Sequence, residues 1–353
     1  MKHSKVLFIL TGITLFSGSL AGGIVVDHTC TDVSKIPLSY LDSVRELDIL
    51  FYHRFIGDSI LLGFDDLIAE DPLRYEIEII RDMNIGWFVE NNGIGHRAFG
   101  GFYPDNKCVI FNEFMREEHF SDVADIAFFK FSVEDFVYKS WWCDIPADSI
   151  WFTFYKPTME ALERDFPEVA FVWWTAPLSD RWGNEEKEVY NTLVRNYCTN
   201  SDKILFDLAD IESHDTLGQP VRDVDGFEAL FPGYGDDGTL LNDLGQRIIA
   251  SGLWWLFAEI VGWNGSVTEK VVPDRLVLNV DLVAGLIRYK LPSAGYVELC
   301  IYDASGREVV RMVNGIKTPG EYSISLDRLS TGIYFCILEG YGQVTTGKII
   351  VID

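Results

Sequence analysis

Short apolar runs alternate with amphipathic stretches over about residues 36–263. Four apolar runs, at residues 47–53, 124–131, 169–175 and 203–208, are typical of strands buried on both faces. Helical patterns cover residues 157–166, 185–197 and 242–261, and the last of these places Leu244, Ile248, Leu256 and Ile260 near one face. Buried strands that alternate with helices predict a flavodoxin-like three-layer α/β/α domain around a parallel sheet. Ligands of such folds bind at the carboxyl ends of the strands.

The pattern changes after residues 264–274, a polar and helix-poor segment that we interpret as a linker. Residues 275–353 consist of short β-rich segments separated by turn residues such as Asp303-Ala304-Ser305-Gly306. The segments lie at residues 286–291, 296–302, 308–313, 320–326, 332–338 and 346–352. This part of the chain is expected to form an all-β, Ig-like antiparallel sandwich without helices.

The first 21 residues have the features of a secretory signal peptide. Lys2 and Lys5 precede an apolar stretch at residues 6–16, and Ser19-Leu20-Ala21 is a small-residue cleavage pattern. A membrane anchor needs about 18 or more apolar residues, and this stretch is shorter. We therefore predict cleavage after Ala21, a first domain at residues 22–263 and no membrane span in the mature chain.

Charge and cysteine content narrow the function classes. The formal net charge of −25 repels nucleic acid and anionic lipid, so neither is an expected partner. The six cysteines are scattered without a CxxC pair, and neither a metal site nor a cofactor is predicted. Export permits disulfides, and a bridge between Cys300 and Cys336 is possible because both lie in predicted strands.

The C-terminal residues resemble the Ig-like sorting domains of type IX secretion and the related hook-cap-like Ig modules. The matching segments are residues 287–292, 297–307, 320–322, 329–335 and 348–351. The Asn-Pro-rich segment usual near the start of these domains is reduced to Asn279-Val280-Asp281-Leu282. The resemblance implies the secretion machinery as a partner, and a secreted or cell-surface location.

The first domain resembles an exported branch of the SGNH/GDSL hydrolases. The similar segments are residues 26–32, 36–37, 128–131, 174–178, 206–214 and 242–245. Such an ester hydrolase needs a serine on the tight turn after the first strand and backbone N–H donors for the oxyanion. It also needs an Asp-x-x-His pair before the last helix, because a serine hydroxyl without a base is a poor nucleophile.

Two alignments compete for the nucleophile. Gly57-Asp58-Ser59 matches the general GDS block, which makes Ser59 the nucleophile and, with Gly101, an oxyanion donor. The exported branch instead shows His-x-Ser, which places its serine at Phe55 and leaves the nucleophile missing. A third interpretation is that Ser59 only caps the helix that follows.

The resemblance places the triad aspartate at Asp237 and the triad histidine at Leu240, which cannot accept a proton. No histidine follows His214 in the chain, so a shift of register cannot supply the base. His214, after the fourth predicted strand, is the candidate substitute. His53 at the end of the first strand and His96 in a Gly-rich loop are weaker candidates.

Two functions therefore remain. The first is a surface binding or scaffold protein with a hydrolase fold and weak or no activity. The second is an active carboxylic-ester hydrolase that uses Ser59 with a displaced histidine. A polysaccharide or acyl ester is the expected ligand, for which Trp141, Trp142 and Trp182 could form a stacking surface. Trp173, Trp174, Trp254 and Trp255 are expected in the core.

Overall fold

The chain divides into two compact units, residues 1–36 with 40–266 and residues 37–39 with 267–353. The computed structural model describes residues 23–54, 56–88, 91–99, 103–137, 139–140, 143–180, 183–236, 240–265, 277–281, 286–291, 295–317, 320–326, 329–340 and 343–351. The predicted signal peptide, most of the predicted linker and Trp141, Trp142 and Trp182 lie outside these residues.

The first unit is built on a parallel sheet of seven strands. They are β1 (Val25–Val26), β2 (Asp48–His53), β3 (Ile79–Arg81), β4 (Gly93–Ala98), β5 (Ile126–Phe129), β6 (Ala170–Trp174) and β7 (Ile204–Phe206), in the order β1-β7-β6-β5-β2-β4-β3. Every pairing is parallel. The inner order β4-β2-β5-β6-β7 is the flavodoxin-like 2-1-3-4-5 pattern, so the direction of winding changes between β2 and β5.

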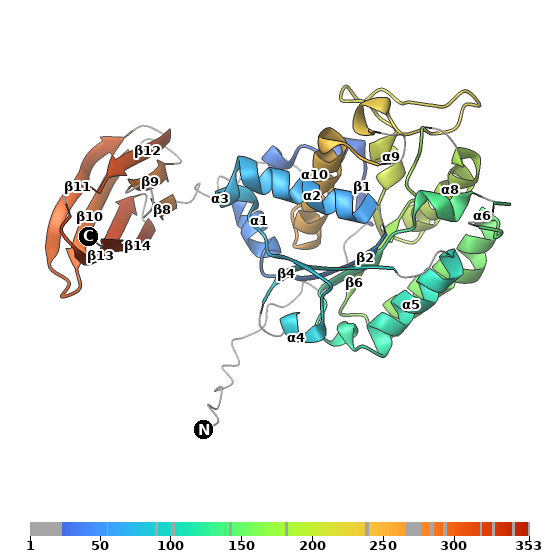
Figure 1. The fold of residues 1–353 in the computed structure, drawn as a ribbon, viewed down its shortest axis with the longest axis horizontal. Coiled ribbons are helices and arrows are strands. Elements are labelled where there is room, and N and C mark those ends of the chain that lie inside the picture. The colour runs from blue at the N-terminus through green and yellow to red at the C-terminus, as the bar shows by residue number, and fades with distance from the viewer. Residues whose placement is uncertain are drawn as a thin grey trace. The chain divides into compact units, whose positions relative to one another are not determined.

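Helices cover both faces of the sheet (Figure 1). The α-helices are α1 (Leu38–Val44), α2 (Ile56–Glu70), α3 (Pro72–Tyr75), α4 (Ile85–Phe88), α5 (Pro104–Arg116), α6 (Ala147–Ser149), α7 (Lys156–Asp165), α8 (Asn184–Asn200), α9 (Leu208–Glu212) and α10 (Asp243–Ile260). Short turns are η1 (His28–Cys30), η2 (Val33–Lys35), η3 (Phe120–Asp122), η4 (Val133–Phe136) and η6 (Pro232–Tyr234), and η5 (Ile150–Tyr155) is a π-helix. The α1, α2 and α10 helices lie on one face and α5 on the other.

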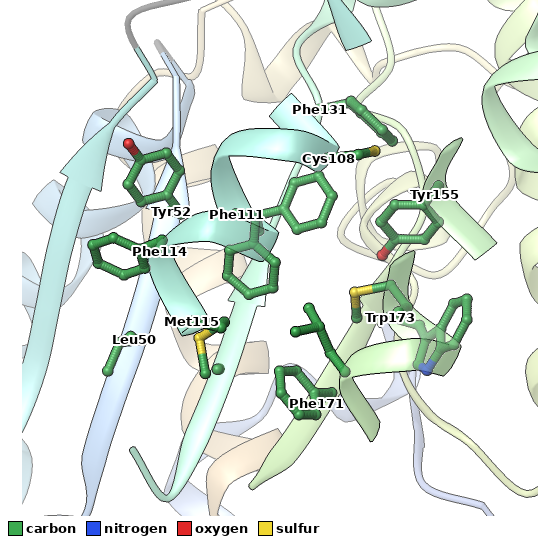
Figure 2. Packing of buried hydrophobic residues seen from close by; sticks show 14 of the residues in the cluster. Leu50, Tyr52, Cys108, Phe111, Phe114, Met115, Phe131, Tyr155, Phe171 and Trp173 are labelled. Carbon is green, nitrogen blue, oxygen red and sulfur yellow. The ribbon is translucent and has the colours of Figure 1, made fainter. Parts of the chain in front are cut away.

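The core on the α5 face is dominated by aromatic side chains. In Figure 2, Phe111 and Met115 of α5 point toward the strands, beside Tyr155 and Trp173. Phe111 packs on Phe129 of β5 with ring centroids 4.7 Å apart. The α8 helix contributes Tyr190, Val194 and Cys198 to the same cluster.

The opposite face is filled by the alternate residues of the same strands, because successive side chains of a strand point to opposite faces. Phe51 stacks on Trp174 at 5.7 Å, and Phe128 lies 6.2 Å from Phe257 of α10. The α2 and α10 helices pack closely, since a Cβ atom on Gly63 would lie only 2.2 Å from the carbonyl oxygen of Gln246.

The second unit is an antiparallel sandwich. Its strands are β8 (Val277–Asp281), β9 (Leu286–Leu291), β10 (Gly295–Asp303), β11 (Glu308–Lys317), β12 (Gly320–Ser325), β13 (Gly332–Gly340) and β14 (Gln343–Val351). They form one sheet of order β11-β10-β13-β14 and another of order β12-β9-β8. Alternate residues such as Ile287, Leu299, Ile301, Leu338 and Ile349 are fully buried between them. Both predicted fold classes are confirmed.

Three expectations need correction. His96 lies in β4 and not in a loop, because the Gly-rich segment pairs with β2. Leu244 of α10 is exposed, since the buried surface of this helix lies mainly at residues 249–258. Cys300 and Cys336 are free thiols. Cys300 pairs across the ladder with Ile337, so the adjacent Cys336 points to the other face of the sheet.

Candidate functional site

The change of winding places the candidate site at the carboxyl ends of β2 and β5, where ligands of this fold class bind. β2 ends at His53 and α2 begins at Ile56. Lys130 directly follows β5 and is fully buried. Burial lowers the pKa of the Lys130 amine, although the nearby Glu212 carboxylate opposes this shift. The edge therefore combines a helix N-terminus with buried nitrogen bases.

Ser59 is the fourth residue of α2 and is half-buried. It lies inside the first turn, so it is not the residue that caps this helix. Among the described residues, no hydrogen bond joins Ser59 to an imidazole. The neighbouring Asp58 lies 3.5 Å from the guanidinium of Arg81, measured between Oδ1 and Nη1. The first turn of α2 thus presents a serine that no described imidazole bonds to.

Three of the predicted site residues, Phe55, Gly101 and Asp237, lie outside the described residues. Leu240 is described and stands shortly before α10, with 44% of its surface exposed. Its carbonyl oxygen accepts a hydrogen bond from the Asp236 amide at 3.0 Å. The side chain at this position is hydrocarbon and exposed.

His53 and His96 form a buried pair at the ends of β2 and β4. The distance between His53 Nε2 and His96 Nδ1 is 2.9 Å. Burial lowers the pKa of His53 well below its ordinary value, and the Lys130 charge adds to this effect. Burial, followed by the Arg81 charge, also lowers the pKa of His96. Both shifts favour the neutral imidazole, and one ring donates to the other in their hydrogen bond.

The His53 ring packs on the start of α2. A Cβ atom on Gly57 would lie 2.1 Å from His53 Cγ, so only glycine fits there. The Nδ1 atom of His53 is buried and has no hydrogen-bond partner among the described residues. The imidazole therefore packs against Gly57, two residues before Ser59 in the chain.

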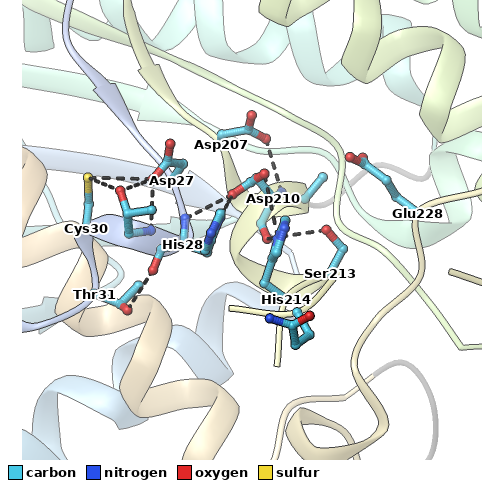
Figure 3. Close-up of polar contacts among 12 residues, drawn as sticks. Asp27, His28, Cys30, Thr31, Asp207, Asp210, Ser213, His214 and Glu228 are labelled. Atoms are coloured by element: carbon cyan, nitrogen blue, oxygen red, sulfur yellow. Dashed lines mark hydrogen bonds and ion pairs between the residues drawn. The ribbon is translucent and has the colours of Figure 1, made fainter. Parts of the chain in front are cut away.

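His214 belongs to a different group, at the edge of β1 and β7 (Figure 3). Its Nδ1 atom lies 2.7 Å from the carbonyl oxygen of Asp210, and its ring stacks on His28 with centroids 3.7 Å apart. His28 in turn bonds to the Asp210 carboxylate. Three strand spacings separate β7 from β2, or roughly 14 Å. The structure thus pairs His214 with Asp210 and His28, whereas Ser59 follows β2.

A network of buried charges lies beside the candidate site. Lys107 bonds to the Asp135 carboxylate and donates to Ser132 Oγ at 3.2 Å. Glu212 accepts the Leu178 amide at 2.6 Å through Oε2, while its Oε1 has no partner among the described residues. Burial raises the pKa of Glu212, and the backbone hydrogen bond opposes this shift.

Lys187 of α8 completes the network and donates to Asn184 Oδ1 at 3.3 Å. Burial lowers the pKa of Lys187 to about 7. Its side chain, like those of Lys107 and Glu212, is almost completely removed from solvent. The network therefore holds several charges that only neighbouring protein groups can stabilise.

Comparison with protein families matches residues 281–352 to the secretion system C-terminal sorting domain. The predicted sorting domain is confirmed, and its presence indicates export to the cell surface or into the medium. None of the described helices is both long and apolar enough to cross a membrane.

Solved structures give weaker similarities. One is a protein from Streptococcus pneumonia described as a platelet activating factor, at 14% identity and TM-score 0.37, over 63% of this chain and 92% of that one. Another, from Parabacteroides merdae and described as a GDSL-like lipase, has 13% identity and TM-score 0.38, over 61% and 97%. A Bacteroides vulgatus protein with an immunoglobulin-like β-sandwich has 18% identity and TM-score 0.19, over 22% and 83%. No protein of curated function matches the chain in sequence.

The sequence analysis did not predict two features of the α/β unit. The buried network could have been suspected from Lys130, a lysine between phenylalanines at the end of an apolar run. The contact of His28 with His214 had no such signal, because the two residues are far apart in the chain and meet only through the pairing of β1 with β7.

Proposed function

We propose that this chain is an exported protein with an SGNH/GDSL-hydrolase-like fold that binds a ligand at the cell surface and hydrolyses esters weakly or not at all. The supporting observation is that Ser59 lies within α2 without a hydrogen bond to any described imidazole. Leu240, at the position expected for the histidine, adds to this support. Loss of a triad member typically costs about 10⁴-fold or more in rate.

The proposed binding region is the sheet edge at the ends of β2, β4 and β5. His53 and His96 form a buried imidazole pair beneath it. The first turn of α2 supplies backbone N–H groups, apart from the Gly57 amide, which bonds to the Arg54 carbonyl oxygen. Such a region can donate hydrogen bonds to the oxygens of a sugar or an acyl ester without carrying out a proton transfer. The expected ligand is therefore a polysaccharide or an acylated derivative of one.

An active esterase is the second candidate. It is favoured by Gly57-Asp58-Ser59 at the start of α2 and by His53, whose ring packs on Gly57 and whose Nδ1 has no described partner. In this alternative a movement of α2 would bring Ser59 to an imidazole. The two candidates differ in one measurable quantity, the serine-dependent rate of ester hydrolysis.

The test is hydrolysis of p-nitrophenyl acetate and of acetylated xylan by the full chain. Ser59→Ala is compared with Ser149→Ala, since both are half-buried serines near helix starts. We expect the three proteins to share one background rate. A rate well above background in the parent and in Ser149→Ala, but lost in Ser59→Ala, would establish the esterase and contradict our proposal.

A further inference from the structure

Two groups of histidine and carboxylate side chains lie at the carboxyl edge of the parallel sheet. One consists of His28, Asp210 and His214, and the other of His53, Asp58 and His96. In each group the three possible ligand atoms lie within 4.8 Å of one another. Imidazole and carboxylate groups in such a cluster are ligands that zinc and related transition metals prefer.

The surrounding charges distinguish the two groups. Asp58 already pairs with Arg81, and the charges of Arg81 and Lys130 both act on the imidazole pair beside it. A dication at that position would be repelled. No lysine or arginine among the described residues forms an ion pair with Asp210, whose partners are His28 and His214. Only the first group is electrostatically suited to a cation.

Arg195 belongs to the neighbouring network around Asp207, and its guanidinium is already engaged. Its guanidinium bonds to both carboxylate oxygens of Asp207, at 2.6 and 2.9 Å. It also bonds to Glu228 at 2.9 Å. Asp27, next to His28, adds a further negative charge at the same edge. The group therefore lies beside several carboxylates, and the arginine of the neighbouring network is held by Asp207 and Glu228.

The ligand atoms converge on one region. His28 Nδ1 contacts Asp210 Oδ1, and His214 Nδ1 lies 3.7 Å from Asp210 Oδ2. The backbone also holds Asp210 in place, because the His28 amide donates to its Oδ1 atom at 3.0 Å. Asp210 and His214 are four residues apart, a spacing that places them on one side of a helical turn. The side chains are about three-quarters or more buried, at 27%, 22% and 15% exposed for His28, Asp210 and His214.

The two imidazole rings are nearly parallel, with an interplanar angle of 10°. A ring nitrogen binds a metal in the plane of its own ring, so an ion shared by both Nδ1 atoms requires one ring to turn about its Cβ–Cγ bond. One face of the His28 ring is covered by the stacked His214 ring, so this turn separates the stacked pair. On the Nε2 side of His28 the neighbour is Gly218, where even an added Cβ atom would remain 3.9 Å away.

We propose that His28, Asp210 and His214 bind one divalent transition-metal ion of the zinc class. The ligands are the Asp210 carboxylate and one ring nitrogen of each histidine. The Nδ1 atoms of His28 and His214 both bond to oxygens of Asp210 in the structure, so a ring that binds the ion through Nδ1 moves its proton to Nε2 and gives up that hydrogen bond. Three protein ligands leave at least one coordination position for water or an exogenous ligand. The site lies at the β1–β7 edge, apart from the region proposed above for ligand binding, so the two proposals stand or fall separately.

The test is titration of the full chain, purified with chelator and reducing agent, with Zn²⁺ followed by calorimetry and with Co²⁺ followed by absorption. We expect one equivalent of Zn²⁺ and a tetrahedral or five-coordinate Co²⁺ spectrum without a thiolate charge-transfer band. His28→Gln and His214→Gln should each weaken binding by more than the 10–100-fold typical of losing an outer-shell partner. His119→Gln, an exposed histidine beside Asp122, should leave binding unchanged.

A thermal-unfolding measurement distinguishes a folded variant that has lost the metal site from a variant that is misfolded. Zn²⁺ should raise the Tm of the parent and of His119→Gln, as expected for an ion that binds the folded state, but not the Tm of folded His214→Gln. The proposal is overturned by the absence of stoichiometric binding to the parent. It is also overturned by full binding in His28→Gln and His214→Gln, or by a Co²⁺–thiolate band that Cys30→Ser removes.

Discussion

At the scale of single residues, the charged side chains in the interior are expected to affect the free energy of unfolding most strongly. Lys107, Lys130 and Lys187 are almost completely buried, together with Asp135 and Glu212. Because a buried charge that loses its partner is costly, removing one member of such a network usually destabilises the fold. The sequence shows that these residues are charged, but not that they meet. Lys187, on an amphipathic helix, has the appearance of a solvated lysine.

Lys187 makes the stability of the α/β unit depend on pH. Its pKa in the folded chain is lowered to about 7 from an ordinary value of 10.5, because burial disfavours the charged amine. The unfolded chain therefore binds more protons between these two values, and the free energy of unfolding rises with pH in this window. For the Lys187 contribution alone, the rise from pH 7 to pH 9.5 is about 3 kcal/mol.

The comparison with Lys187→Met isolates this contribution. We expect the free energy of unfolding of the parent, minus that of Lys187→Met, to increase by about 2–3 kcal/mol from pH 7 to pH 9.5. Denaturant unfolding at the two pH values measures it. Lys35→Met, which changes an exposed lysine, should show no such increase. If the difference in free energy of unfolding between parent and variant were the same at both pH values for Lys187→Met as well as for Lys35→Met, Lys187 would not be a buried amine.

Elements with a strong hydrophobic pattern could be predicted, and short or unusual ones could not. The runs that became β2, β5, β6 and β7 are continuously apolar, as strands covered on both faces must be. β4 was not predicted as a strand, because Gly93-Ile94-Gly95-His96 resembles a loop. A side chain at Gly95 would meet Phe88 and Met83, so close packing and not flexibility explains that glycine. β1 and β3 are too short to show a period.

The α10 helix shows that hydrophobic periodicity alone does not predict which residues of a helix are buried. An amphipathic helix has one apolar stripe, but α10 lies between α2 and the strands and is buried on most sides over residues 249–258. For the candidate site, the sequence supplied Ser59, Leu240 and His214, each on a recognisable segment. It could not supply the partners of His53 and His214, because these contacts depend on strand order and not on spacing along the chain.

We expect the two units of the molecule to have separate roles. The α/β unit offers the candidate ligand-binding edge, whereas residues 281–352 match a sorting domain. The sandwich has its own buried core, so its removal need not unfold the first unit. Export and ligand binding should therefore be separable by truncation.

Deletion of residues 274–353 should abolish delivery to the cell surface in a host with the type IX machinery and leave the α/β unit folded. Fractionation and surface labelling measure delivery, and unfolding of the purified truncated chain checks its fold. As a control, the last 79 residues, 275–353, are fused to a reporter that carries the native N-terminal segment, and they should direct that reporter to the surface. Undiminished surface delivery of the truncated chain would show that the sorting domain is not what exports this protein.

The central claim, a hydrolase-like fold without a working serine nucleophile, is tested most directly by a fluorophosphonate probe. Such probes react with a serine hydroxyl only when a base activates it. Incubation of the full chain, followed by mass spectrometry of the peptide that contains Ser59, should show no adduct beyond that seen at Ser149 in the same sample. A stoichiometric adduct at Ser59, absent when the chain is denatured before labelling, would contradict the account.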